Sequence, residues 1–128
     1  MGPRQYVVDS SVFVAFYSGA DVNHSLALRF FSEVNEAILV VHPYVIQETA
    51  SVLCYKYGYE AAVPFLDHVL KATNIIIPSV NLTNEIAGFL VLRKKISFTD
   101  TALIQLAKRL HAELVTFDKQ MISLAKRS

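Results

Sequence analysis

Cysteine is nearly absent from this sequence, and no stretch of it stays apolar for long. Cys54 is the single cysteine among 128 residues, so no intramolecular disulfide can form, which is typical of a reducing compartment. No apolar run approaches the roughly 18 residues that a membrane-spanning helix needs. One arginine precedes the first apolar stretch and Asp9 interrupts it, a pattern that argues against a signal peptide. We therefore expect one domain over residues 1–128, located in the cytoplasm and without a membrane partner.

An excess of charge of one sign is also missing. The 12 lysine and arginine residues nearly balance the 11 aspartate and glutamate residues, which leaves a formal net charge of +1. Net charge therefore gives no support to nucleic-acid binding, and any affinity for phosphates has to come from local basic residues. Apolar residues, in contrast, make up 53% of the chain, and the mean hydropathy is +0.38. This surplus suggests that some apolar side chains are buried between subunits.

Four short β-like runs alternate with segments of helix length. The runs are QYVV (5–8), AILVV (37–41), NIIIP (74–78) and ELVTF (113–117). The segment PYVIQETASVLCYKYG has Pro43 at its first turn and ends at Gly58, which are the usual start and stop signals of a helix. In the next segment, Pro64 is expected to kink or restart the helix. Strands that alternate with helices and are apolar on both faces predict an α/β fold, a parallel sheet of about four to five short strands with helices on both faces.

Acidic residues stand where two of these strands end. Asp9 closes the first run, and Asp118 follows the last. Right-handed crossovers place the carboxyl ends of parallel strands at one edge of the sheet, where α/β proteins form their sites. Asp9 and Asp118 are therefore expected to be neighbours. The alternative is that each only caps the helix that follows it, because aspartate is a favoured cap.

Two further acids lie on helices. In SFTDTALIQLAKRL, a step of about 100° per residue places Asp100 inside the apolar arc and turns Thr101 outward. The alternative for Asp100 is a capping box with Ser97. Glu48 lies at the flank of the apolar face of its helix. The alternative for Glu48 is an ordinary glutamate at the boundary of that face, with no role in a site.

Carboxylates that converge need a neutralising partner. Two of them about 4 Å apart repel by roughly 4 kcal/mol at an effective dielectric of about 20. Lys119, next to Asp118, is the one basic residue beside an acid at a strand end. Hard divalent cations such as Mg²⁺ or Mn²⁺ take oxygen ligands, and sites for phosphate chemistry supply a few carboxylates and leave other positions to water and substrate. A divalent metal is therefore the better neutraliser.

The chain resembles the PIN domain in VVDSSVFVAF, in the helix with Glu48, and in SFTDTALIQLAKRLHAELVTFDKQM. In particular it is similar to the small single-domain ribonucleases of VapC type, the toxins of toxin–antitoxin pairs, over essentially its whole length. The resemblance places the family's acidic quartet, which holds one or two Mg²⁺ or Mn²⁺ ions, on Asp9, Glu48, Asp100 and Asp118. Ser11 matches a small polar position after the first acid, and Thr116 matches the hydroxyl residue before the last. Thr101 stands where relatives often have alanine, but it is expected to face outward and to change little. Thr99 stands where tyrosine is frequent, so the substrate groove can differ there.

The resemblance implies a metal-dependent endoribonuclease. The expected substrate is single-stranded RNA or an RNA loop, and the expected products carry 5′-phosphate and 3′-hydroxyl groups. A homodimer is expected, with HSLALRFF and PYVIQETASVLCYKYGY contributing to it, and a cognate antitoxin is a further expected partner. The alternatives are a PIN-fold RNA-processing nuclease without an antitoxin, and a catalytically silent PIN-fold binding module. The basic residues nearest in sequence to the acids, which can bind the RNA backbone or be solvated surface, are Arg93, Lys94, Lys95, Lys108, Arg109 and Lys119.

Two other classes of protein also gather acids at strand ends. A phosphoacceptor receiver domain needs an acidic pair near the first strand, but here Asp9 is followed by Ser10 and Ser11. A haloacid-dehalogenase-type phosphatase needs Asp-x-Asp, and Ser11 occupies the second position of that motif. Both classes are therefore disfavoured against the nuclease.

Overall fold

Strands and helices alternate along the chain, as the sequence pattern predicts. The computed structural model describes residues 2–127. The strands are β1 (Gln5–Val8), β2 (Ile38–Val40), β3 (Ile75–Ile76) and β4 (Glu113–Val115). The helices are α1 (Ser10–Tyr17), α2 (His24–Glu33), α3 (Pro43–Tyr57), α4 (Tyr59–Lys71), α5 (Leu82–Leu92), α6 (Phe98–Leu110) and α7 (Lys119–Arg127).

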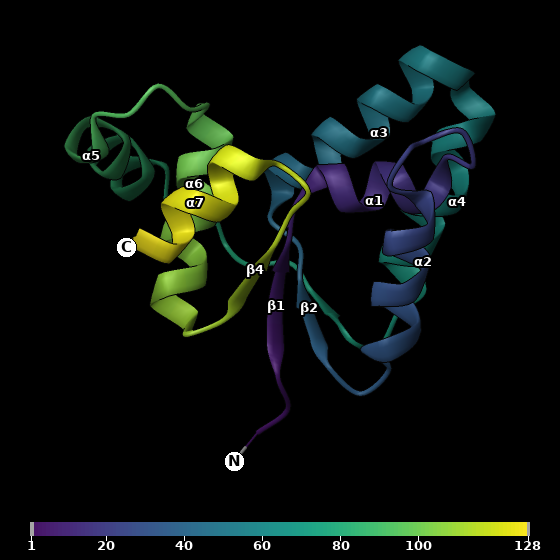
Figure 1. Cartoon of the computed structure of the whole chain (residues 1–128), viewed down its shortest axis with the longest axis horizontal. Coiled ribbons are helices and arrows are strands. Elements are labelled where there is room, and N and C mark those ends of the chain that lie inside the picture. The colour runs from purple at the N-terminus through teal and green to yellow at the C-terminus, as the bar shows by residue number, and fades with distance from the viewer. Residues whose placement is uncertain (1, 128) are drawn as a thin grey trace.

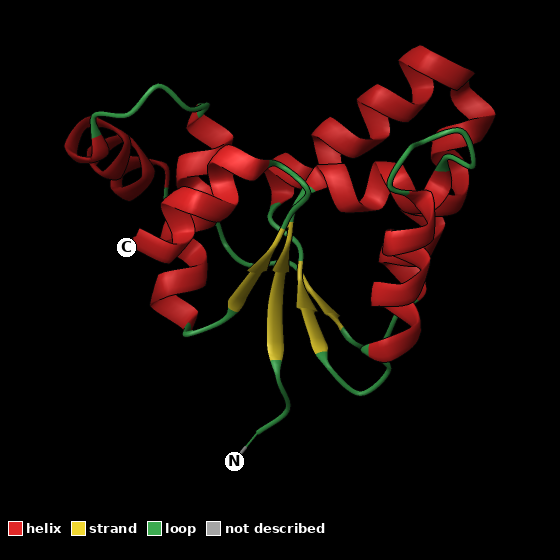
Figure 2. Ribbon diagram, viewed as in Figure 1, coloured by secondary structure: helices red, strands yellow, loops and turns green. Residues whose placement is uncertain are grey.

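The described strands form one parallel sheet in the order β3-β2-β1-β4. Val7 is in register with Val40 on one side and with Leu114 on the other. All strand arrows therefore point toward one edge, at the top of Figure 2. The expected fold class, an α/β fold with a parallel sheet of about four to five strands, is confirmed.

Helices cover both faces of the sheet (Figure 1). Helices α1 to α4 pack together on one face, and α5 to α7 lie on the other, where α6 contacts β1 and β4. The central strand is consequently buried on both faces, with Val7 and Val8 fully inaccessible to solvent. None of the described helices has the length and apolar character that a membrane crossing requires.

Two local expectations, a helix restart at Pro64 and a last strand that reaches Phe117, are wrong. Helix α4 continues through Pro64 without a break, and Ala62, Phe65 and Val69 bury one side of it against the core. The last strand ends at Val115 rather than at Phe117, so Asp118 lies three residues beyond it. The chain turns there because the Thr116 hydroxyl accepts a hydrogen bond from the backbone N–H of Asp118.

Candidate functional site

Asp9 sits where β1 passes into α1, at the carboxyl edge of the sheet. It is 4% exposed and occupies the N-cap position of α1, yet its side chain makes no capping hydrogen bond. Its Oδ2 atom instead accepts hydrogen bonds from the hydroxyls of Ser11 and Thr116, both at 2.8 Å. The capping alternative therefore does not account for Asp9.

The two hydroxyl side chains link Asp9 to the loop that follows β4. Ser11 Oγ also accepts from the backbone N–H of Phe117 at 3.1 Å, and Thr116 Oγ1 accepts from that of Asp118 at 3.0 Å. Each hydroxyl thus donates to the carboxylate and accepts from the backbone, which fixes the direction of its proton. The loop is held against β1 as well by the Asp9 N–H, which donates to the Val115 carbonyl at 2.9 Å.

Asp118 combines a capping role with an available oxygen. Its Oδ1 atom accepts from the backbone N–H groups of Gln120 at 2.8 Å and Met121 at 3.2 Å, which is the pattern of an N-cap of α7. The side chain is exposed. Within residues 2–126, its second oxygen has no hydrogen-bond partner in the protein. The capping interpretation therefore holds for Asp118, and it leaves one oxygen free for a ligand.

Glu48 projects from α3 and is exposed. Its Oε1 atom accepts a hydrogen bond from the hydroxyl of Ser10, which is 9% exposed. Ser10 is the first residue of α1, so the residue next to Asp9 orients a second acid from another helix. Sequence reasoning missed Ser10, because only the packing of α1 on α3 shows that residues 38 positions apart meet.

Asp100 lies in the first turn of α6 and is partly buried. Burial, followed by the negative charge of Asp9, raises its pKa to about 6, and Asp118 and Glu48 add smaller contributions in the same direction. A hydrogen bond with Ser97 partly opposes that rise. The backbone N–H of Asp100 donates to Ser97 Oγ at 3.0 Å, so Ser97 does cap the helix. The contributions of Asp9, Asp118 and Glu48 to that rise in pKa place Asp100 within electrostatic reach of all three other acids.

These acids have no basic partner in the part of the chain that the structure describes. The one lysine or arginine ion pair in that part of the chain joins Lys71 to Asp67, and His42 is hydrogen-bonded to Glu85 instead. No three histidine, cysteine or acidic side chains among the described residues come close enough to form a metal site on their own. Mg²⁺ is usually held by one or two carboxylates together with water and substrate phosphates. A set of coupled but loosely spaced carboxylates with unshared oxygens fits an ion of that kind.

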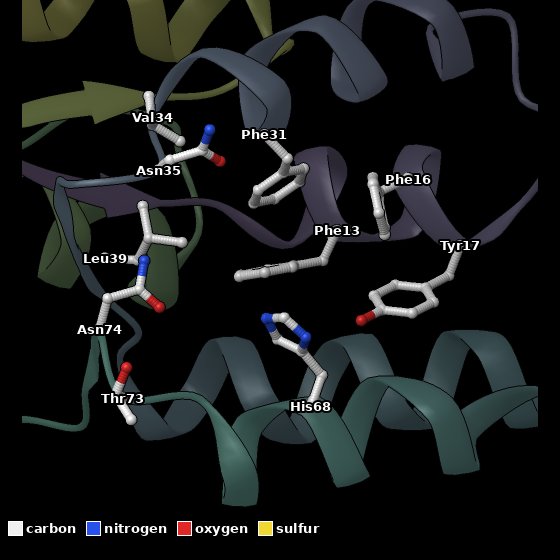
Figure 3. Close-up of a pocket in the computed structure, with 10 residues that line it drawn as sticks. All are labelled: Phe13, Phe16, Tyr17, Phe31, Val34, Asn35, Leu39, His68, Thr73 and Asn74. Carbon is white, nitrogen blue, oxygen red and sulfur yellow. The ribbon is translucent and has the colours of Figure 1, made fainter.

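A separate cavity of about 290 Å³ opens among α1, α2 and α4. In Figure 3, His68 of α4 points toward the ring of Phe13, with Tyr17 beside it. None of the four acids lines this cavity. Its lining consists of Phe13, Phe16, Tyr17, Phe31, Val34, Asn35, Leu39, His68, Thr73 and Asn74.

The fold and the acids together place this chain among the α/β proteins whose acidic site lies beyond the carboxyl ends of parallel strands. The model of one such family, the PIN domain, matches residues 6–127, and the chain belongs to that family. The fold is similar to the crystal structure of Mycobacterium tuberculosis VapC20, described as a sarcin-ricin loop cleaving toxin, with a TM-score of 0.81 and 19% sequence identity. That match covers 93% of this chain and 94% of the VapC20 chain. No curated protein sequence matches the chain. The expected PIN family is thus confirmed.

Proposed function

We propose that the protein is a metal-dependent endoribonuclease that hydrolyses RNA phosphodiester bonds, and that it is the toxin of a toxin–antitoxin pair. The proposal rests on the buried Asp9 carboxylate, which Ser11 and Thr116 orient, and on its charge, which acts with burial to raise the pKa of Asp100. Burial and the charges of three other acids all oppose ionisation of Asp100, and perturbed carboxylates of this kind cluster at functional sites. The PIN family of the chain and the RNA-cleaving structural neighbour support the same conclusion.

The four acids share one part in this proposal. Asp9, Asp100, Glu48 and Asp118 would hold Mg²⁺ or Mn²⁺. Asp9 is pre-oriented, because two hydroxyls fix its Oδ2 atom while its Oδ1 atom has no hydrogen-bond partner among the described residues. When bound, the ion neutralises charge on the phosphate and lowers the pKa of water. Ser11 and Thr116 keep the Asp9 carboxylate in one rotamer, and Ser10 does the same for Glu48.

The proposal also includes the residues that bind RNA, the oligomeric state, the protein partner and the cellular compartment. RNA phosphates would bind to exposed cations that are near Asp100 in the chain, first of all Arg93, Lys94 and Lys95. Residues 1–128 act as a single PIN-like domain in the cytoplasm, a homodimer that binds a cognate antitoxin. The single Cys54 is in keeping with a reducing compartment.

Cleavage of labelled RNA with and without metal tests the proposal. Purified protein should cleave single-stranded or looped RNA with added Mg²⁺ or Mn²⁺ and stop when EDTA is in excess. Asp9→Asn should lose about 100-fold or more, because it weakens the pre-oriented ligand. Asp67→Asn is the matched control, since Asp67 is an exposed acid paired with Lys71 on α4, and it should cleave as the wild type does. Full activity in excess EDTA would rule out the metal-dependent reaction.

A further inference from the structure

Three half-buried aromatic rings stand together beside the acids. The rings of Tyr44 and Phe98 are 6.3 Å apart between centroids, and those of Phe98 and Phe89 are 5.5 Å apart. Each ring keeps part of its surface accessible to solvent. We call Tyr44, Phe89 and Phe98 the aromatic shelf. Neither the acid site nor the cavity of Figure 3 includes any of them.

Helix geometry places the aromatic shelf next to the carboxylates. Tyr44 precedes Glu48 by four residues on α3, so the two side chains lie on the same side of that helix, one turn apart. Phe98 is two residues before Asp100 in the first turn of α6. The first turns of α3 and α6 lie near the carboxyl edge of the sheet (Figure 1). Each of the two helices therefore contributes one ring and one acid to the region near that edge.

A partly buried carboxylate, that of Glu85, holds the ring of Tyr44 in place. The Tyr44 hydroxyl donates to Glu85 Oε1 at 2.7 Å, and the Nε2 atom of His42 lies 2.7 Å from Glu85 Oε2. His42 Nδ1 accepts the backbone N–H of Tyr44 at 3.0 Å, so the neutral imidazole carries its proton on Nε2 and donates it to Glu85. The His42 and Tyr44 rings also contact each other, with centroids 4.2 Å apart. Two donors on one carboxylate therefore fix the shelf to α5.

Three basic residues lie in the chain between two of the rings. Arg93, Lys94 and Lys95 follow one another in the chain between Phe89 and Phe98, and all three are exposed. The segment is anchored, because the Lys95 carbonyl accepts a hydrogen bond from the Gln120 side chain at 3.2 Å. Proteins that bind single strands combine such cations, which contact the backbone, with aromatic rings on which bases stack.

We propose that the aromatic shelf is a base-stacking subsite for the single-stranded RNA that occupies the acid site. The proposal rests on the proposed nuclease function and assigns the residues that receive a base next to the cleaved phosphate. Stacking depends on the flat face of a base and not on its hydrogen-bonding edge. The subsite therefore accepts any base and prefers purines, which present the larger face.

The absence of tryptophan from the chain allows a direct test. Phe98→Trp introduces a single indole into the shelf, and Phe16→Trp introduces one beside the cavity of Figure 3, away from the acids. Each variant is titrated, in Mg²⁺, with a short oligoadenylate whose linkages resist cleavage and with an abasic oligomer of equal length and charge. The oligoadenylate should quench the indole of Phe98→Trp, while the abasic oligomer should not. Neither oligomer should quench that of Phe16→Trp.

Affinity gives a second readout that does not depend on fluorescence. Phe98→Leu keeps an apolar side chain at the position but removes the flat face. It should weaken binding of the oligoadenylate by about 5- to 100-fold and leave binding of the abasic oligomer unchanged. If Phe98 has only a structural role, Phe98→Leu should weaken binding of both oligomers alike or of neither. That result would overturn the proposal.

The two proposals fail in distinguishable ways. If the wild type cleaves RNA but the indole of Phe98→Trp is not quenched, the stacking subsite is wrong and the nuclease stands. If the indole is quenched by bases but the wild type cleaves no RNA, the subsite stands as a single-strand binding surface and the nuclease is wrong.

Discussion

At the residue scale, Asp9 and Asp118 show two different uses of an aspartate beyond a strand end. Asp118 caps α7 with one oxygen, whereas Asp9 precedes α1 without capping it and accepts two hydroxyl donors instead. Both residues look the same in sequence, as an acid before a helix. The difference arises from Thr116, which is 107 residues away from Asp9 and reaches its carboxylate only in the folded sheet.

Asp100 gives the site a pH dependence that can be measured without metal. Its pKa of about 6 in the folded protein lies above its ordinary value of 3.8, so between those values the folded state binds more protons than the unfolded state. Its contribution to stability is therefore present at low pH and is lost as the pH rises through about 6. In EDTA, the melting temperature of the wild type relative to Asp100→Asn should rise as the pH falls from about 7.5 to 5.

Comparing the two proteins at each pH removes from this prediction the titration of groups that do not interact with Asp100. A difference in melting temperature that stays constant from pH 7.5 to 5 would contradict the assigned environment of Asp100.

The predicted exposure of Thr101 is wrong. The helical period turned it outward, but it is 1% exposed, and its hydroxyl donates to the Ser97 carbonyl at 3.2 Å. Helix α6 contacts β1 and β4 as well as α5 and α7, so most of its circumference is covered. A helical wheel assumes one buried face and one exposed face, so it cannot predict which side chains are buried in a helix that is packed on nearly all sides.

At the scale of elements, the sequence predicted most of the fold because its signals are local. Strand runs, Pro43 at a helix start and Gly58 at a helix end each depend on neighbouring residues, and all three are confirmed. Contacts between distant elements were not predictable in this way. Ser10 meeting Glu48, and Glu85 joining α5 to His42 and Tyr44, follow from how the helices pack.

Gly58 separates α3 from α4, and its substitution tests whether its backbone conformation sets the boundary between the two helices. Its φ of 98° and ψ of 164° lie in a region that residues with a Cβ atom rarely adopt, although a Cβ there would meet nothing within 4 Å. Gly58→Ala should lower the free energy of unfolding by about 1–3 kcal/mol through backbone strain alone, as measured by urea denaturation.

Gly19→Ala is the control for this substitution. A Cβ at Gly19 also meets nothing within 4 Å, but Gly58 is the one glycine with positive φ among the described residues. Equal stability of the two variants would show that backbone strain at Gly58 does not define the helix boundary.

At the scale of the whole molecule, large apolar side chains remain on the surface. Tyr55, Tyr57 and Tyr59, around the junction of α3 and α4, are 95%, 51% and 72% exposed, and Leu26 and Leu28 of α2 are about half exposed. These positions fall within the two segments expected to contribute to a homodimer. The homodimer stays a prediction, and burial of such surface between two copies would explain the 53% apolar composition.

Light scattering tests this prediction. The protein should have the mass of a dimer at micromolar concentration and keep it across ordinary salt, because apolar burial is screened little by ions. A monomer under those conditions would contradict it.

The central claim is that acids from four segments form one metal-dependent site, and the melting temperature of Asp100→Asn with and without Mg²⁺ tests it most directly. Removing one charge relieves repulsion, so at neutral pH in EDTA the variant should melt at the same temperature as the wild type or higher. Mg²⁺ should raise the melting temperature of the wild type by linkage and that of the variant much less, and the variant should lose nearly all RNA cleavage. The claim is contradicted if the variant melts lower in EDTA, as loss of a structural cap worth about 1 kcal/mol would cause, and still cleaves RNA.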